Sequence, residues 1–141
     1  MSNIIKFFVT TRDHALAALA AGPDASIRVA TFGNFDAEEA LLEWESHLTG
    51  RSFNALVGED TPEVVAEIED GPIVLALSAE LTEALTSQNR SIDELARWWV
   101  SEKADDGMEL EPLIASEILH ELVDLINQER EVGKDVYCWT G

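Results

Sequence analysis

Two pairs of side chains have the spacing of metal ligands. Glu43 and His47 are four residues apart, and Glu117 and His120 are three residues apart. In a helix, both spacings place the two side chains on one face, where they can share a metal ion. Two such pairs facing each other would resemble a carboxylate di-metal site, and they suggest a metal-dependent or small-ligand enzyme.

The expected helical faces argue against this metal site. His120 lies opposite the apolar spine of its predicted helix, and His47 lies on the polar side of its own helix. Side chains that point into solvent do not converge in a bundle core, so we predict no metal and no cofactor. A metal-dependent or small-ligand enzyme that uses Glu43, His47, Glu117 and His120 remains the alternative hypothesis.

Other catalytic motifs are missing from the sequence. It contains neither the G-x-S-x-G elbow of hydrolases nor a glycine-rich phosphate loop. Cys138 is the single cysteine and lies in the apolar run DVYCW, so we expect a buried, unreactive thiol. No pair of carboxylates stands out for acid–base work among the 28 acidic residues. We therefore predict a protein that binds rather than catalyses.

The net charge of −19 is the strongest signal in the composition. Residues 31–70 hold eleven acids against Arg51 alone, whereas residues 1–30 carry a net charge of +1. A field of this sign repels phosphate groups, so nucleic acids and anionic membranes are not expected partners, and a basic protein is favoured. The simpler alternative is that the acidity only keeps the protein in solution.

The first acidic segment has the pattern of a well-defined helix. Asp36 is placed to cap it, Glu39 takes the capping-box position, and Gly50 ends it. Its apolar stripe consists of Ala37, Leu41, Trp44 and Leu48. At about 100° per residue, Glu39 and Glu43 project opposite this stripe, and no lysine four residues on offsets their repulsion.

A second acidic segment extends from Glu59 to Asp70. We expect the acids of both segments to form an exterior surface that steers a basic protein toward the molecule. The predicted binding residues are Asp36, Glu38, Glu39, Glu43, Glu45, Glu59, Asp60, Glu67 and Glu69.

The remaining pattern predicts a single α+β domain over residues 1–141. Strands are expected at 3–10, 26–33 and 134–140, and as a hairpin within 64–78. The first two strands, with a helix between them, are compatible with a parallel pair in a small mixed sheet covered by four to five helices. Helices are expected after Thr11 or Thr10, after Asp36, Ser78 and Ser91, and over 111–131, and the irregular segment 51–63 has room for one helical turn after Ser52. The longest helix has the spine Ile114, Ile118, Leu122 and Leu125.

Four short motifs occur in order along the chain: IIKFFVT, HLTG, IVLALSAELTEAL and DVYCW. This order resembles the YfbM-like family of small bacterial proteins, in which a tryptophan-containing helix ends in Leu-Thr-Gly. The resemblance implies an α+β fold that closes with helices and a last short strand. It implies no particular activity, because the family has no established biochemical function.

These observations favour an acidic, cytoplasmic protein-binding module. No apolar run approaches the ~20 residues that span a membrane, and the opening apolar stretch is too short for a signal peptide. The most concrete version of the hypothesis is an inhibitor of a basic toxin, of the immunity-protein kind. A further alternative is a structural homodimer sealed by Trp98 or Trp139, although core packing is the expected role of Trp98 and Trp99.

Overall fold

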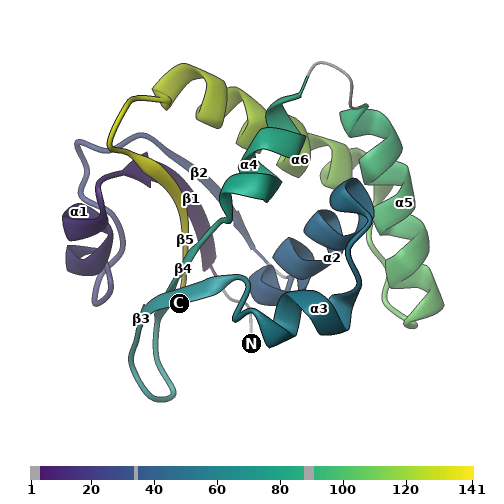
Figure 1. Cartoon of the computed structure of the whole chain (residues 1–141), viewed down its shortest axis with the longest axis horizontal. Coiled ribbons are helices and arrows are strands. Elements are labelled where there is room, and N and C mark those ends of the chain that lie inside the picture. Colours follow the sequence, from purple (N-terminus) through teal and green to yellow (C-terminus); the bar gives the residue numbers. More distant parts are fainter. Residues whose placement is uncertain (1–3, 34, 88–90) are drawn as a thin grey trace.

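The fold is built on one antiparallel sheet of five strands. The structure is a computed structural model that describes residues 4–33, 35–87 and 91–141. Within these residues the strands are β1 (Ile4–Thr10), β2 (Val29–Gly33), β3 (Glu63–Glu67), β4 (Ile73–Ala76) and β5 (Asp135–Thr140). Their order across the sheet is β2-β1-β5-β4-β3, so the last strand of the chain lies in the centre (Figure 1).

The predicted α+β class is confirmed, but the mixed sheet and the parallel opening are wrong. β1 pairs with β2 in the antiparallel direction, and the other neighbouring pairs are antiparallel as well. A parallel connection must carry the chain back along β1, whose seven residues span about 23 Å. The helix between the two strands has six residues and covers about 9 Å, so β2 starts beside the end of β1.

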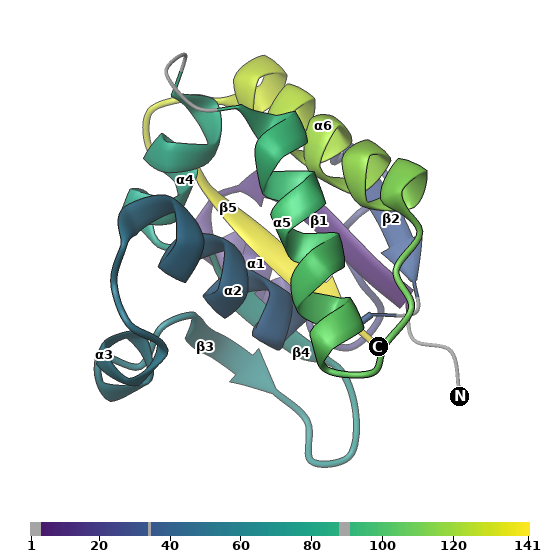
Figure 2. The same cartoon turned by 90° about the vertical axis from the view of Figure 1, so that its right-hand side faces the viewer.

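Helices cover the two faces of the sheet unequally, and the described residues form six of them rather than four to five. They are α1 (Arg12–Ala17), α2 (Ala37–Thr49), α3 (Phe53–Gly58), α4 (Ala79–Thr86), α5 (Ile92–Asp105) and α6 (Pro112–Glu129). α1 lies on one side of the sheet, and α2, α4, α5 and α6 lie on the other (Figures 1 and 2). None of the helices in the described ranges combines the length and the apolar character needed to cross a bilayer.

Side-chain caps explain why the helix starts were predictable. The side chains of Thr11, Asp36, Ser52, Ser78 and Ser91 each accept a hydrogen bond from the backbone N–H three residues on. At the end of α2, Gly50 adopts the left-handed conformation, with φ of 75°. These local signals are independent of the tertiary fold, and the predicted caps at Asp36, Ser78 and Ser91 are confirmed. Of the two candidates for α1, Thr11 is the cap, and the helical turn expected after Ser52 is α3.

The larger core is centred on two tryptophans that join α2 to α5. The buried rings of Trp44 and Trp99 meet edge to face, with centroids 5.0 Å apart and planes at 86°. The predicted stripe of α2 is buried, as expected. In α6 the spine is confirmed except at Ile114, which is 47% exposed. The buried face runs instead through Ala115, one residue further on, and this turns Ile114 about 100° to the side.

Adjacent residues of β5 face the two opposite cores. Cys138 belongs to the larger core and is fully buried, and this burial raises the pKa of its thiol, which agrees with the predicted packing role. Trp139 belongs to the smaller core under α1, where its Nε1 donates a hydrogen bond to the Leu19 carbonyl at 2.9 Å. The ring of Trp139 is therefore largely buried within its own chain, and a homodimer sealed by it stays a prediction.

β3 and β4 form the predicted hairpin, which projects from the body of the molecule (Figure 1). The Ile68 N–H donates to the Pro72 carbonyl at 2.9 Å, and the Gly71 N–H donates to the Ile68 carbonyl at 2.8 Å. Proline has no N–H, so Gly71 supplies the donor that Pro72 lacks. The hairpin therefore accommodates Pro72 at its turn, and β3 forms one edge of the sheet.

Candidate protein-binding surface

The two predicted metal pairs do not form in the structure. His47 points its Nε2 at both carboxylate oxygens of Glu94, at 3.1 Å each, and not at Glu43. His120 places its Nε2 2.8 Å from Oδ1 of Asp93, and not beside Glu117. Each histidine thus joins its own helix to the first turn of α5, and the metal-dependent version of the alternative loses its ligand set.

Trp98 is partly covered by one of these histidines. The rings of His47 and Trp98 are stacked, with centroids 4.2 Å apart and planes at 16°. One face of Trp98 therefore packs within its own chain, as expected for a residue at the margin of the α5 stripe. A homodimer through the rest of Trp98 stays a prediction.

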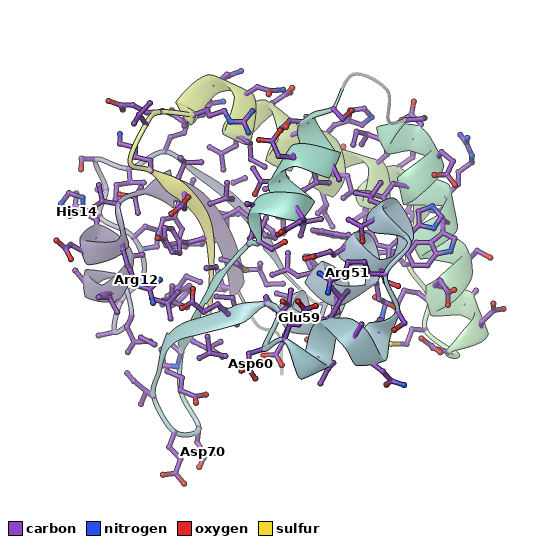
Figure 3. The ribbon with its side chains drawn as sticks, in the orientation of Figure 1. Arg12, His14, Arg51, Glu59, Asp60 and Asp70 are labelled. Atoms are coloured by element: carbon purple, nitrogen blue, oxygen red, sulfur yellow. The ribbon has the colours of Figure 1, made fainter. Side chains whose placement is uncertain are left out.

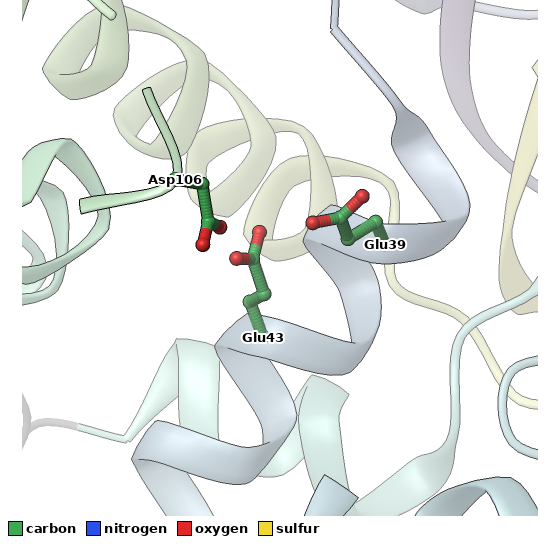
Figure 4. A group of neighbouring side chains, drawn as sticks. All are labelled: Glu39, Glu43 and Asp106. Atoms are coloured by element: carbon green, nitrogen blue, oxygen red, sulfur yellow. The ribbon is translucent and has the colours of Figure 1, made fainter. Parts of the chain in front are cut away.

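One group of carboxylates in the described residues has the geometry of a cation site. Single oxygens of Glu39, Glu43 and Asp106 all lie within 4.8 Å of one another (Figure 4). The ammonium group of Lys103 already occupies this position, since its Nζ lies 2.9 Å from Oε1 of Glu39 and 2.9 Å from Oε1 of Glu43. We therefore interpret the group as an internal ion pair between α2 and α5.

This ion pair corrects the prediction for Glu43, which was expected on the exterior. The residue is only 5% exposed and Lys103 is 6% exposed. Burial raises the pKa of Glu43, against the hydrogen bond from Lys103. Burial also opposes the charge of Lys103, but its hydrogen bonds to Glu43 and Glu39 outweigh this and raise the lysine pKa. α2 has no lysine four residues after Glu39 or Glu43. Lys103 of α5 supplies the positive charge instead.

Glu45 was also expected on the exterior and is only 1% exposed. Its Oε1 accepts a hydrogen bond from Oγ of Ser78 at 2.7 Å. Oγ of Ser78 accepts in turn from the backbone N–H of Leu81, in the first turn of α4. Glu45 therefore ties α2 to the start of α4, and neither Glu43 nor Glu45 can contact a partner from within the core.

Three of the remaining acids are partly neutralised at the surface. Glu39 shares Lys103, and Glu59 pairs with Arg51. Glu63 forms a two-point contact with Arg12 at 2.9 and 3.2 Å, and this hydrogen bonding lowers the pKa of Glu63. A further acid, Asp36, is exposed but serves as the cap of α2.

Five exposed acids in residues 35–70 neither cap a helix nor form an ion pair with any residue that the structure describes. We call them the unpaired acids; they are Glu38, Asp60, Glu67, Glu69 and Asp70. Figure 3 shows Asp60 near the start of the β3–β4 hairpin and Asp70 at its tip, pointing away from the body. Four of the five belong to the predicted binding residues, and Asp70 ends the second predicted acidic segment.

Two of the unpaired acids border a groove between α2, α3 and the start of β3. We call it the acidic groove; its volume is about 560 Å³, and its lining residues are Glu38, Leu42, Val57, Asp60, Thr61, Pro62, Glu63 and Val64. Val57 and Val64 are exposed apolar side chains. The groove therefore combines an apolar lining with carboxylates, which is the environment that the aliphatic stem and charged end of a lysine or arginine require.

The acids here have few cationic neighbours. The sequence contains no lysine, arginine or histidine from residue 52 to residue 89. Arg51 and Arg12 reach the region from outside this segment and are engaged by Glu59 and Glu63 (Figure 3). The negative potential around the groove and the hairpin is therefore only partly offset within the chain.

The groove itself was not visible in the sequence. Glu63 and Val64 come from a strand, Glu38 and Leu42 from α2, and Val57 from α3. The density of acids between Glu59 and Asp70 was the one available signal, and this segment contributes Asp60 to Val64 to the groove.

The comparisons with known proteins give no assignment. No protein-family model, no curated protein and no solved structure matches the chain significantly. The resemblance to the YfbM-like family therefore stays a prediction, and the argument for function depends on the surface alone.

Proposed function

We propose that the protein is a non-enzymatic binding module for a basic protein, and that the partner docks on the acidic groove and the adjoining hairpin. The observation that supports this most is the set of unpaired acids beside an exposed apolar groove. An acidic surface that serves solubility alone does not need a hollow with an apolar lining. The proposal keeps the cytoplasmic location predicted from the sequence.

Electrostatics in this proposal mainly set the rate and the choice of partner. Exposed ion pairs contribute about 0–1 kcal/mol each, so the rim acids alone do not make a tight complex. They attract a basic surface and orient it, while burial of apolar area around Val57 and Val64 supplies affinity. A basic toxin neutralised by an immunity protein is one partner of this kind.

A pair of charge-reversal variants tests the proposal. We expect Glu38→Lys/Glu67→Lys to lose a basic protein that the wild type captures from an extract of the native host at low salt. The matched control is Glu117→Lys/Glu121→Lys, which makes the same change in net charge on the exposed side of α6. The control should retain the captured protein.

Salt and stability complete this test. Added salt should slow association with the wild type, because exposed charges are screened within about 10 Å at 0.1 M. Thermal melting of both variants checks that they remain folded. Equal capture by the two variants, or capture that salt does not affect, would count against the proposed function.

A further inference from the structure

We infer that the basic partner docks as an extended strand added to the outer edge of β3. This inference rests on the proposed function and adds the mode of recognition. An added strand gains main-chain hydrogen bonds from the sheet edge, and its side chains supply the specificity.

β3 offers a free edge to such a strand. It is the last strand in the sheet order and has β4 as its neighbour on the inner side. The tip of the hairpin stands away from the helices (Figure 1), whereas Glu63 at the start of β3 contacts Arg12 of α1. Val64 in β3 and Ile68, the residue after the strand, are 44% and 45% exposed.

The hairpin geometry indicates which backbone groups face outward. Ile68 donates its N–H inward to the Pro72 carbonyl. In an antiparallel pair the bonding direction alternates from one residue to the next, so the N–H of Glu67 points away from β4. This donor is available to an added strand.

The charges along the edge select a basic occupant. Exposed acids without an ion pair lie at the far end of β3 and in its turn: Glu67, Glu69 and Asp70, whereas Glu63 at the other end is shared with Arg12. A second copy of the chain would bring these carboxylates against its own, and like charges directly opposite each other destabilise a strand pair. A strand with alternating lysine or arginine converts the same acids into partners.

The acidic groove extends the contact at one end of this edge. Glu63 and Val64, the first residues of β3, also line the groove. A side chain of the added strand that points into the groove packs against Val57 and Val64 and lies beside Asp60. The edge and the groove thus form one continuous surface.

A synthetic peptide tests the mode of docking. The probe is a blocked ten-residue peptide of alternating lysine and threonine, and its comparison carries N-methyl groups on the four central residues. Both peptides have the same charge, but the four central residues of the second have no N–H and cannot donate main-chain hydrogen bonds. We expect calorimetry to show at least about tenfold weaker binding of the N-methylated peptide.

A backbone variant tests the same edge from the other side. Glu67→Pro removes the outward N–H without removing an inward one, and proline is tolerated on edge strands. Glu67→Gln is its control, since it removes the same charge and keeps the N–H. We expect Glu67→Pro to bind the unmodified peptide at least about tenfold more weakly than Glu67→Gln does.

Three results would overturn strand addition. They are equal affinity for the two peptides, equal affinity of the two Glu67 variants, and no measurable binding of the unmodified peptide. If Glu67→Pro does not fold, the peptide comparison still decides the question. The proposed function is judged separately, because a charge-reversal variant that loses a basic protein supports it whatever the docking mode.

Discussion

Lys103 is the residue on which the arrangement of α2 and α5 depends most. Its ammonium group is buried and lies between the carboxylates of Glu39 and Glu43. Trp44 and Trp99 pack the same two helices together. A buried carboxylate without its cation is strongly unfavourable, whereas replacing a whole buried pair by apolar groups is often neutral. Lys103 is therefore needed because Glu43 is present.

We expect Lys103→Met to lower the free energy of unfolding by about 3–5 kcal/mol, because it leaves the Glu43 carboxylate buried without a cation. Urea denaturation at neutral pH measures this loss. Lys134→Met is the control, since Lys134 forms an exposed pair with Glu131, and its loss should be within about 1 kcal/mol. The double variant Lys103→Met/Glu43→Leu should recover most of the stability.

Equal losses for Lys103→Met and Lys134→Met would contradict the assignment.

At the scale of elements, α2 divides its acids between structure and surface. Asp36 caps the helix, Glu43 pairs with α5 and Glu45 binds the start of α4. Glu39 shares Lys103 with Glu43, so Glu38 is the exposed acid of α2 that has neither a cap nor an ion-pair role. The helical wheel located the apolar stripe correctly. It could not show that two more helices pack against the flanks of α2, and this packing buries acids that the wheel places outside.

Ser78 makes two hydrogen bonds, one within α4 and one to α2. It caps α4 through the N–H of Leu81 and donates to the buried Glu45. We expect Ser78→Ala to cost about 2–4 kcal/mol, since a helix cap is worth about 1 kcal/mol and a buried group left unsatisfied costs about 1–3 kcal/mol. Denaturant titration measures this cost.

Ser52→Ala is the matched control for this prediction. Ser52 caps α3 in the same way, but its cap is exposed and has no buried acid behind it. Its loss should be about 1 kcal/mol. If the two serine variants lose the same stability, the hydrogen bond between Ser78 and Glu45 makes no measurable contribution to the free energy of unfolding.

For the whole molecule, the sequence predicted what local chemistry determines. Caps such as Ser91, the turn at Gly71 and the apolar run of β5 are readable because each depends on neighbouring residues. Sheet order, the antiparallel opening and the pairing of Lys103 with Glu43 depend on contacts between distant segments. A single sequence carries no direct signal for these contacts.

The candidate surface likewise has features that the sequence predicted and features that depend on contacts between distant segments. The charge count located the acidic region between Glu59 and Asp70, and the structure shows exposed acids there. It also removes Glu43 and Glu45 from the surface and adds the apolar groove, which three separate elements build. Within residues 35–70 the exposed acids are therefore fewer than the charge count implied, and those without a cap or ion-pair role lie along the groove and the hairpin.

The most direct test of this surface is a titration of the isotope-labelled protein with the lysine–threonine peptide, followed by amide chemical shifts. The account predicts that the largest shifts fall at Glu38 and within residues 57–70, and that they decrease with added salt. Shifts of similar size spread over every acidic segment, including Glu117 and Glu121 on α6, would contradict the claim that this protein presents one site for a basic partner.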